Sequence, residues 1–219
     1  MSFSIDCGSR NTEDIVFVTH SCSRNTIEYI FQSVLPKLES SHTVLDVGSR
    51  LGAVLYGAYL FSSAGKIMGI EINKELCDLQ RKVIQSFGFN DRISIIHSEM
   101  TRCSDIFESA DIVILNNVFE WFVTAENQTF MWQFLSSSIK VGAFLVTMPS
   151  LEKATKNTPQ AATLHHWVRP LNYSRPEKVE SLGDNDDIYL YQVIKKAAHF
   201  NGCQHNHISD KIVPTDMDI

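Results

Sequence analysis

Apolar residues in the central part of the chain follow two alternating patterns. Short, almost continuous apolar runs predict buried strands at residues 43–47, 67–72, 92–97, 111–115 and 143–148. Apolar positions at helical spacing predict helices at residues 25–38, 51–62, 74–87 and 126–139, with glycines closing the last two at Gly88 and Gly142. Apolar strands that alternate with helices indicate a parallel sheet covered on both faces.

The pattern changes after residue 148. Residues 149–187 mix proline, asparagine, serine and charged residues, with one short strand expected at 167–171, and residues 188–194 read as a long β-rich strand. A late strand after a polar connection is typical of an antiparallel hairpin at the edge of a parallel sheet. The sequence therefore predicts a Rossmann-like α/β fold, with a seven-stranded, mostly parallel sheet, an antiparallel edge hairpin and helices on both faces.

The predicted domain organisation follows from the same pattern. Residues 26–195 form a single domain, which is a size sufficient for a full core. Residues 1–25 are polar and expected to be irregular, and they are a candidate lid over a bound cofactor. Residues 196–219 are expected to be a disordered tail.

Composition narrows the range of partners and cellular compartments that we expect for this protein. The net charge of −6 argues against a broad nucleic-acid surface. The five cysteines are scattered without a CxxC pair, which suits reduced thiols in the cytoplasm or nucleus. We expect no secretory signal, and the longest apolar run, residues 53–61, is too short to span a membrane. The histidines of the tail lack partners at ligand spacing elsewhere, so we predict no metal site.

The turn after the first strand of the domain carries the strongest functional signal. Its sequence, DVGSRLG, places Gly48 where backbone approaches a ligand and Gly52 where a helix starts close to that ligand. A dinucleotide fingerprint would also need glycines at positions 50 and 53, and this chain has Arg50 and Ala53 there. The turn therefore predicts a nucleotide-like cofactor that is not a dinucleotide.

Acidic and amide side chains follow four successive strands. Asp46 is placed to hold a cofactor's ammonium group, and Glu71, 19 residues after Gly52, is placed to accept ribose hydroxyls. Glu99 and Asn116 come after the next two strands. Ligands of open α/β sheets bind at the carboxyl ends of the strands, so we expect these side chains to gather there. Together they favour S-adenosylmethionine as the cofactor.

The segments VLDVGSRLG, GIEI, HSEM and DIVILNNVFEWF resemble those of class I S-adenosylmethionine-dependent methyltransferases, and the resemblance covers residues 43–194. Within that superfamily, DVGSRLG and LNNVFEWF are most similar to the non-SET histone-lysine methyltransferases, the disruptor-of-telomeric-silencing family. Arg50 stands where that family has its central glycine.

The resemblance implies a role for each matching residue. The methionine part of the cofactor would contact Asp46, Gly48 and Gly52, its ribose Glu71, and its adenine Glu99 and Met100, and Ser49 and Ile72 are further cofactor-binding residues. Asn116 would sit closest to the transferred methyl group, and Phe119 and Trp121 would line the acceptor's approach. These three residues are the predicted catalytic set.

Three hypotheses about function follow. The first is methyl transfer to a nucleophilic side chain, with a protein lysine as the candidate. The second is methyl transfer to an amine of a small molecule or nucleobase. The third is a catalytically degenerate, methyltransferase-like binding module, which Arg50 favours and Asp46, Glu71 and Asn116 disfavour. The partners that these hypotheses require are an acceptor substrate and, where activity needs one, an activating subunit.

Overall fold

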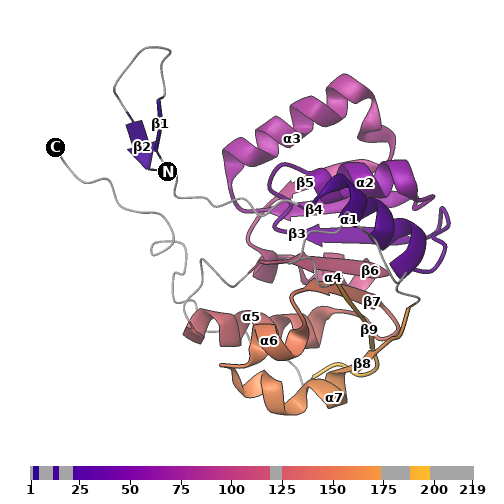
Figure 1. Ribbon diagram of the computed structural model, residues 1–219, viewed down its shortest axis with the longest axis vertical. Helices are drawn as coiled ribbons and strands as arrows, with labels where there is room; N and C mark the ends of the chain where they lie inside the picture. The colour runs from indigo at the N-terminus through magenta and orange to yellow at the C-terminus, as the bar shows by residue number, and fades with distance from the viewer. Residues whose placement is uncertain (1, 5–11, 15–21, 119–124, 174–187, 198–219) are drawn as a thin grey trace.

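A seven-stranded mixed sheet forms the centre of the molecule, with strands in the order β5–β4–β3–β6–β7–β9–β8 (Figure 1). The computed structural model describes residues 2–4, 12–14, 22–118, 125–173 and 188–197. The strands are β3 (Thr43–Val47), β4 (Lys66–Glu71), β5 (Ile93–His97), β6 (Ile112–Asn116), β7 (Phe144–Met148), β8 (Val168–Pro170) and β9 (Tyr189–Val193). Strands β3 to β7 pair in parallel, and β9 runs antiparallel to both β7 and β8. The predicted fold class is confirmed.

Successive strand residues face opposite sides of the sheet, and each side has its own core. On one side Val44, Ile112 and Val146 pack with helices α1 (Arg24–Tyr29), α2 (Ala53–Phe61) and α3 (Lys74–Phe87). On the other side Leu45 and Val113 pack with α4 (Ser104–Ser109), α5 (Ala125–Ser138), α6 (Leu151–Thr155) and α7 (Leu164–Trp167).

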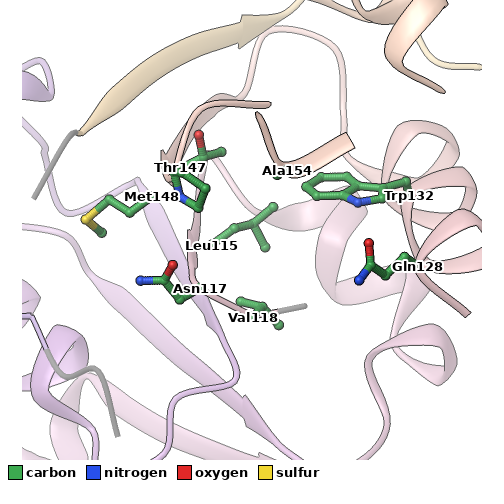
Figure 2. Close-up of a pocket in the computed structure, with 9 residues that line it drawn as sticks. Leu115, Asn117, Val118, Gln128, Trp132, Thr147, Met148 and Ala154 are labelled. Carbon is green, nitrogen blue, oxygen red and sulfur yellow. The ribbon is translucent and has the colours of Figure 1, made fainter. Parts of the chain in front are cut away.

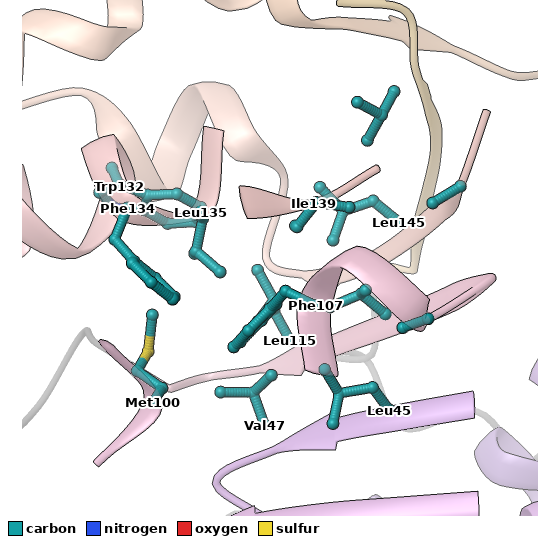
Figure 3. Close-up of a cluster of buried hydrophobic side chains, with 14 of the residues drawn as sticks. Leu45, Val47, Met100, Phe107, Leu115, Trp132, Phe134, Leu135, Ile139 and Leu145 are labelled. Carbon is teal, nitrogen blue, oxygen red and sulfur yellow. The ribbon is translucent and has the colours of Figure 1, made fainter. Parts of the chain in front are cut away.

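The second core is built around aromatic side chains from two helices (Figure 3). Phe107 of α4 and Phe134 of α5 meet edge to face, with ring centroids 5.3 Å apart. Such a contact contributes about 0.5–1.5 kcal/mol beyond the area that the rings bury. Burial on both faces explains why the central strands β3, β6 and β7 are mostly apolar.

Helix α3 has the bounds that its sequence signals predict. The Asn73 side chain accepts a hydrogen bond from the backbone N–H of Leu76 (3.0 Å), and Gly88 ends the helix with φ +70°. Both are standard helix-end interactions.

The helix predicted at residues 25–38 is shorter. Helix α1 continues as a π-helical segment, Ile30–Val34, and the chain becomes extended at Leu35 (φ −80°, ψ 150°). The reason is Pro36, whose ring disfavours helical backbone in the residue before it.

Other expectations are corrected as well. Residues 1–25 were expected to be irregular, but β1 (Ser2–Ser4) and β2 (Thr12–Asp14) pair as a two-stranded antiparallel sheet.

Three short helices were not predicted. Helix α4 precedes β6, and α6 and α7 lie in the connection after β7. The tail predicted from residue 196 lies outside the described residues from position 198 onward. Within the described ranges, every helix is too short or too polar to cross a membrane.

Candidate functional site

The turn between β3 and α2 folds back over the end of β4. Gly48, Arg50 and Gly52 all have positive φ, at +72°, +50° and +81°. The backbone N–H groups of Gly48 and Ser49 both donate to the carbonyl oxygen of Ile70 on β4 (2.8 and 3.1 Å). A left-handed conformation is unfavourable for arginine, so the surrounding hydrogen bonds must hold it.

Glu71, at the end of β4, supplies one of those bonds. Its side chain is buried, with one carboxylate oxygen accepting the N–H of Arg50 (2.9 Å) and the other that of Asn73 (2.8 Å). Each carboxylate oxygen can accept a further hydrogen bond. Glu71 is thus held in place by the turn and still has the capacity to accept two hydroxyl groups. The next residue, Ile72, has 54% of its surface exposed.

A glycine in β4 lets the turn pack this closely. A Cβ atom on Gly69 would lie 2.7 Å from the Ser49 hydroxyl oxygen and 2.7 Å from Leu55 Cδ1. Gly69 pairs with Asp46 across the two strands, so the space beside it is part of the same site.

Asp46 is a buried acid at this site, with 3% of its surface exposed. Burial, and next the charge of Glu71, raise its pKa to about 8, while the positive charge of Arg50 opposes the rise. The carboxyl group is therefore largely protonated at neutral pH. A cation beside it would favour the ionised form.

Beside these residues lies a pocket that we call the turn pocket, with about 340 Å³ of empty space, which includes part of the solvent at its opening. The side chains and backbone that line it come from three elements and the segment before α1. They are Cys22, Asp46, Gly48, Ser49, Arg50, Leu51, Ala53, Val54 and Asn116.

The end of β6 forms one wall of the turn pocket. Asn116 Nδ2 donates to the sulfur of Cys22 (3.0 Å), and Asn117 Nδ2 donates to Asn116 Oδ1 (3.1 Å). Asn117 has φ +50°, and its backbone N–H donates to the carbonyl oxygen of Met148 (2.7 Å). The two amides therefore have fixed orientations where β6 leaves the sheet.

A second pocket, which we call the Trp132 pocket, lies on the other side of this wall (Figure 2). It has about 320 Å³ of space and is lined by Leu115, Asn117, Val118, Gln128, Trp132, Thr147, Met148, Pro149 and Ala154. Figure 2 shows Trp132 and Gln128 facing Asn117 across Leu115 and Val118. Among the described residues, none that lines this pocket is charged.

The two pockets are close neighbours. A Cβ atom on Gly48, in the turn pocket, would lie 3.6 Å from Val118 Cγ1, in the Trp132 pocket. The Cys22 thiol likewise lies 3.9 Å from the sulfur of Met148. The Asn116–Val118 segment contributes to both pockets, because Asn116 lines the turn pocket and Asn117 and Val118 line the Trp132 pocket.

Helix α6 closes the Trp132 pocket and is held to the sheet by Tyr191 of β9. The Tyr191 hydroxyl accepts the backbone N–H of Leu151 (3.2 Å) and donates to the Glu152 carboxylate (2.9 Å). The Ser150 side chain caps the helix by accepting the N–H of Lys153 (3.2 Å). These bonds fix the position of Ala154 at the pocket.

The structure brings together part of the predicted site. The predicted cofactor residues that line the turn pocket are Asp46, Gly48, Ser49 and Asn116, while Gly52, Glu71 and Ile72 lie beside it in the turn and at the end of β4. Glu99 follows β5 and accepts a hydrogen bond from the Thr101 hydroxyl (2.8 Å). Met100 is buried in the core beside α4. The ligand contacts of these residues stay predictions, and Phe119 and Trp121 lie outside the described residues.

Several pocket residues were not predicted. They come from four different parts of the chain and form no local motif: Cys22 before α1, Gln128 and Trp132 on α5, Thr147 on β7 and Ala154 on α6. The apolar spacing of α5 marks Trp132 as a core residue only. The neighbouring His165 and His166 are exposed on α7 and line neither pocket.

Solved structures share this fold. An O-methyltransferase from Bacillus cereus, solved in complex with S-adenosylhomocysteine, matches with a TM-score of 0.54 and 13% identity, covering 81% of this chain and 84% of the other. A precorrin-6y C5,15-methyltransferase from Geobacter metallireducens matches with a TM-score of 0.50 and 15% identity, covering 79% and 87%. At these identities the likeness shows the fold alone.

The sequence itself matches a family described as a methyltransferase domain over residues 38–196. The chain belongs to this family and is a class I S-adenosylmethionine-dependent methyltransferase by fold and family. A search of curated proteins gave no match.

Proposed function

We propose that the protein transfers a methyl group from S-adenosylmethionine to an acceptor that enters the Trp132 pocket. The observation that carries this proposal is Glu71, a buried carboxylate that two backbone N–H groups hold at the mouth of the turn. Its position after β4 suits a ribose with two neighbouring hydroxyl groups. In this arrangement the methionine end of the cofactor lies in the turn pocket, and exposed Ile72 is free to pack against the adenine.

The cofactor supplies an activated methyl group on a positively charged sulfur. The acceptor's lone pair attacks this carbon, the sulfur–carbon bond breaks, and the sulfur keeps the bonding electrons. The protein's task is to align the two reactants, which contributes on the order of 7–11 kcal/mol in favourable cases. Asn116 and Asn117, whose amides are hydrogen-bonded to each other between the two pockets, are the groups placed for this alignment.

The lining of the Trp132 pocket favours an uncharged acceptor. An ammonium group or a phosphate entering it would lose water without gaining a charged partner among the described residues. A lysine, the acceptor that the resemblance to histone-lysine methyltransferases suggests, fits if its apolar stem lies along Trp132 and its amine arrives neutral. Desolvation lowers the pKa of an amine and so favours that form.

A small molecule with a flat ring is the second candidate. The indole of Trp132 offers an aromatic surface, and Gln128 offers an amide group beside it (Figure 2). An aromatic or heteroaromatic amine would stack on such a surface. A binding module without turnover is the third candidate.

Calorimetric titration with S-adenosylhomocysteine, with NAD as the control, tests the cofactor. Micromolar binding of the first ligand alone is expected, and binding of neither would contradict the proposal. Incubation with donor labelled in its methyl group, first with lysine peptides and then with aromatic amines, separates the acceptors. Cofactor binding with no transfer to peptides, small molecules or a cell extract would favour the binding module.

A further inference from the structure

The turn pocket has two acids nearby but a single basic side chain. Among its described lining residues, Arg50 alone carries a permanent positive charge. The methionine end of the proposed cofactor carries an ammonium and a carboxylate. Asp46 suits the ammonium, and the carboxylate requires a cation or several N–H donors.

The backbone holds Arg50 at the pocket. Its φ of +50° places it in the left-handed region, and its N–H is bound to Glu71 (2.9 Å). The turn is also hydrogen-bonded to Ile70 through Gly48 and Ser49, so the backbone position of Arg50 is fixed. Arg50 is half-buried and lines the turn pocket, and its positive charge opposes the rise that burial and Glu71 cause in the pKa of Asp46. Its guanidinium therefore lies near the pocket.

We infer that Arg50 binds the carboxylate of the cofactor's methionine end. This inference rests on the proposed function. A guanidinium can give a carboxylate two parallel hydrogen bonds, and it remains charged at every relevant pH. Asp46 and Arg50 together then offer one acid and one base to a zwitterion. Arg50, which stands where the histone-lysine methyltransferases have a glycine, would thus make the protein prefer a cofactor that carries the carboxylate.

The test compares two ligands on two proteins. S-Adenosylmethionine has the carboxylate; decarboxylated S-adenosylmethionine lacks it but keeps the sulfonium and ammonium groups. Arg50→Asn removes the charge and keeps a residue that tolerates a left-handed backbone. Arg50→Lys is the matched variant that keeps the charge.

Calorimetry should show that the wild type prefers the intact cofactor by about 10- to 100-fold, as expected for a charge-assisted pair. Arg50→Asn should bind both ligands about equally, since it loses affinity for the intact cofactor only. Arg50→Lys should keep part of the preference. Circular dichroism of each variant checks that it is folded.

Three results would overturn the inference. Equal losses for both ligands in Arg50→Asn would mean that Arg50 acts on the turn rather than on the carboxylate. Tighter binding by Arg50→Asn would mean that the guanidinium competes with the cofactor. An unchanged preference would remove Arg50 from recognition while leaving the proposed function intact. Absence of binding by the wild type, in contrast, would contradict the proposed function itself.

Discussion

The two pockets differ in what they are made of. The turn pocket is shaped by backbone, with three positive-φ positions in five residues and N–H groups bonded to Ile70 and Glu71, and it carries charge. The Trp132 pocket is shaped by side chains from β6, β7, α5 and α6 and is lined by uncharged residues within the described ranges. Most substitutions leave the backbone geometry of a turn unchanged, whereas every substitution of a lining side chain changes the shape of a pocket that is built from side chains. A pocket shaped by backbone suits a cofactor that is the same in all related enzymes. A pocket shaped by side chains suits an acceptor that differs from one enzyme to the next.

The largest effect should come from removing the acid that holds the turn. Glu71→Ala removes the carboxylate that is proposed to accept hydrogen bonds from the ribose hydroxyls. It also leaves the backbone N–H groups of Arg50 and Asn73 without a hydrogen-bond acceptor. Hydrogen bonds to a charged group contribute about 1.5–3 kcal/mol each, so loss of the bonds to the ribose hydroxyls should lower the affinity for S-adenosylhomocysteine by about 100-fold or more. Calorimetry measures this. Asp78→Ala, which removes an exposed acid on α3, is the control and should bind like the wild type. Wild-type affinity in Glu71→Ala would remove the ribose assignment.

The next effect is a pH dependence confined to the turn pocket. Asp46 has a pKa of about 8 in the free protein, and the cofactor's ammonium should bind its ionised form. Below pH 8 the carboxyl group must lose a proton before it can pair, so affinity should fall as the pH decreases. The limit is about tenfold per pH unit, until the pKa of the bound state is reached.

Titrations between pH 6 and pH 8.5 measure this slope. Asp46→Asn should bind more weakly at pH 8.5 and show little change with pH. A wild-type affinity that is flat across this range would contradict the pairing of Asp46 with the ammonium.

A smaller effect should separate the two pockets. Ala154→Phe places a ring in the Trp132 pocket from α6, and it should raise the KM for the acceptor by about tenfold while cofactor affinity changes less than twofold. The strain of overpacking, about 1–3 kcal/mol, should lower thermal stability without changing the turn pocket. Ala154→Ser is the control with little added volume. Methylation at the wild-type rate and KM in Ala154→Phe would place the acceptor elsewhere.

The smallest effect concerns stability. The Thr147 hydroxyl is buried beside the Trp132 pocket and has no hydrogen-bond partner among the described residues. Thr147→Val keeps the shape and removes the unpaired group, so the free energy of unfolding should rise by about 1 kcal/mol. Thermal unfolding measures this change. A lower melting temperature for Thr147→Val would show that the hydroxyl has a partner.

Local signals made the turn region predictable. The strand Thr43–Val47 and the helix Lys74–Phe87 have the predicted bounds, because a glycine, an asparagine cap and apolar periodicity act within a few residues. The positions of Asp46 and Glu71 beside the turn were predictable for the same reason, since Asp46 is the next-to-last residue of β3 and Glu71 is the last residue of β4. The helix that was expected to reach residue 38 ends earlier, because Pro36 acts on Leu35.

The sequence by itself determined the class of fold, the glycine turn and the acids beside it. Their geometry depends on interactions between near neighbours or between strands that pair in chain order. Only the tertiary structure decided the Trp132 pocket, because the parallel register that sets Asn116 beside Met148 joins residues more than 30 positions apart. It also decided that Met100 belongs to the core and that Asp46 has a raised pKa. The burial of a side chain and the charges around it depend on all the segments that pack against it, and a local sequence pattern does not contain that information.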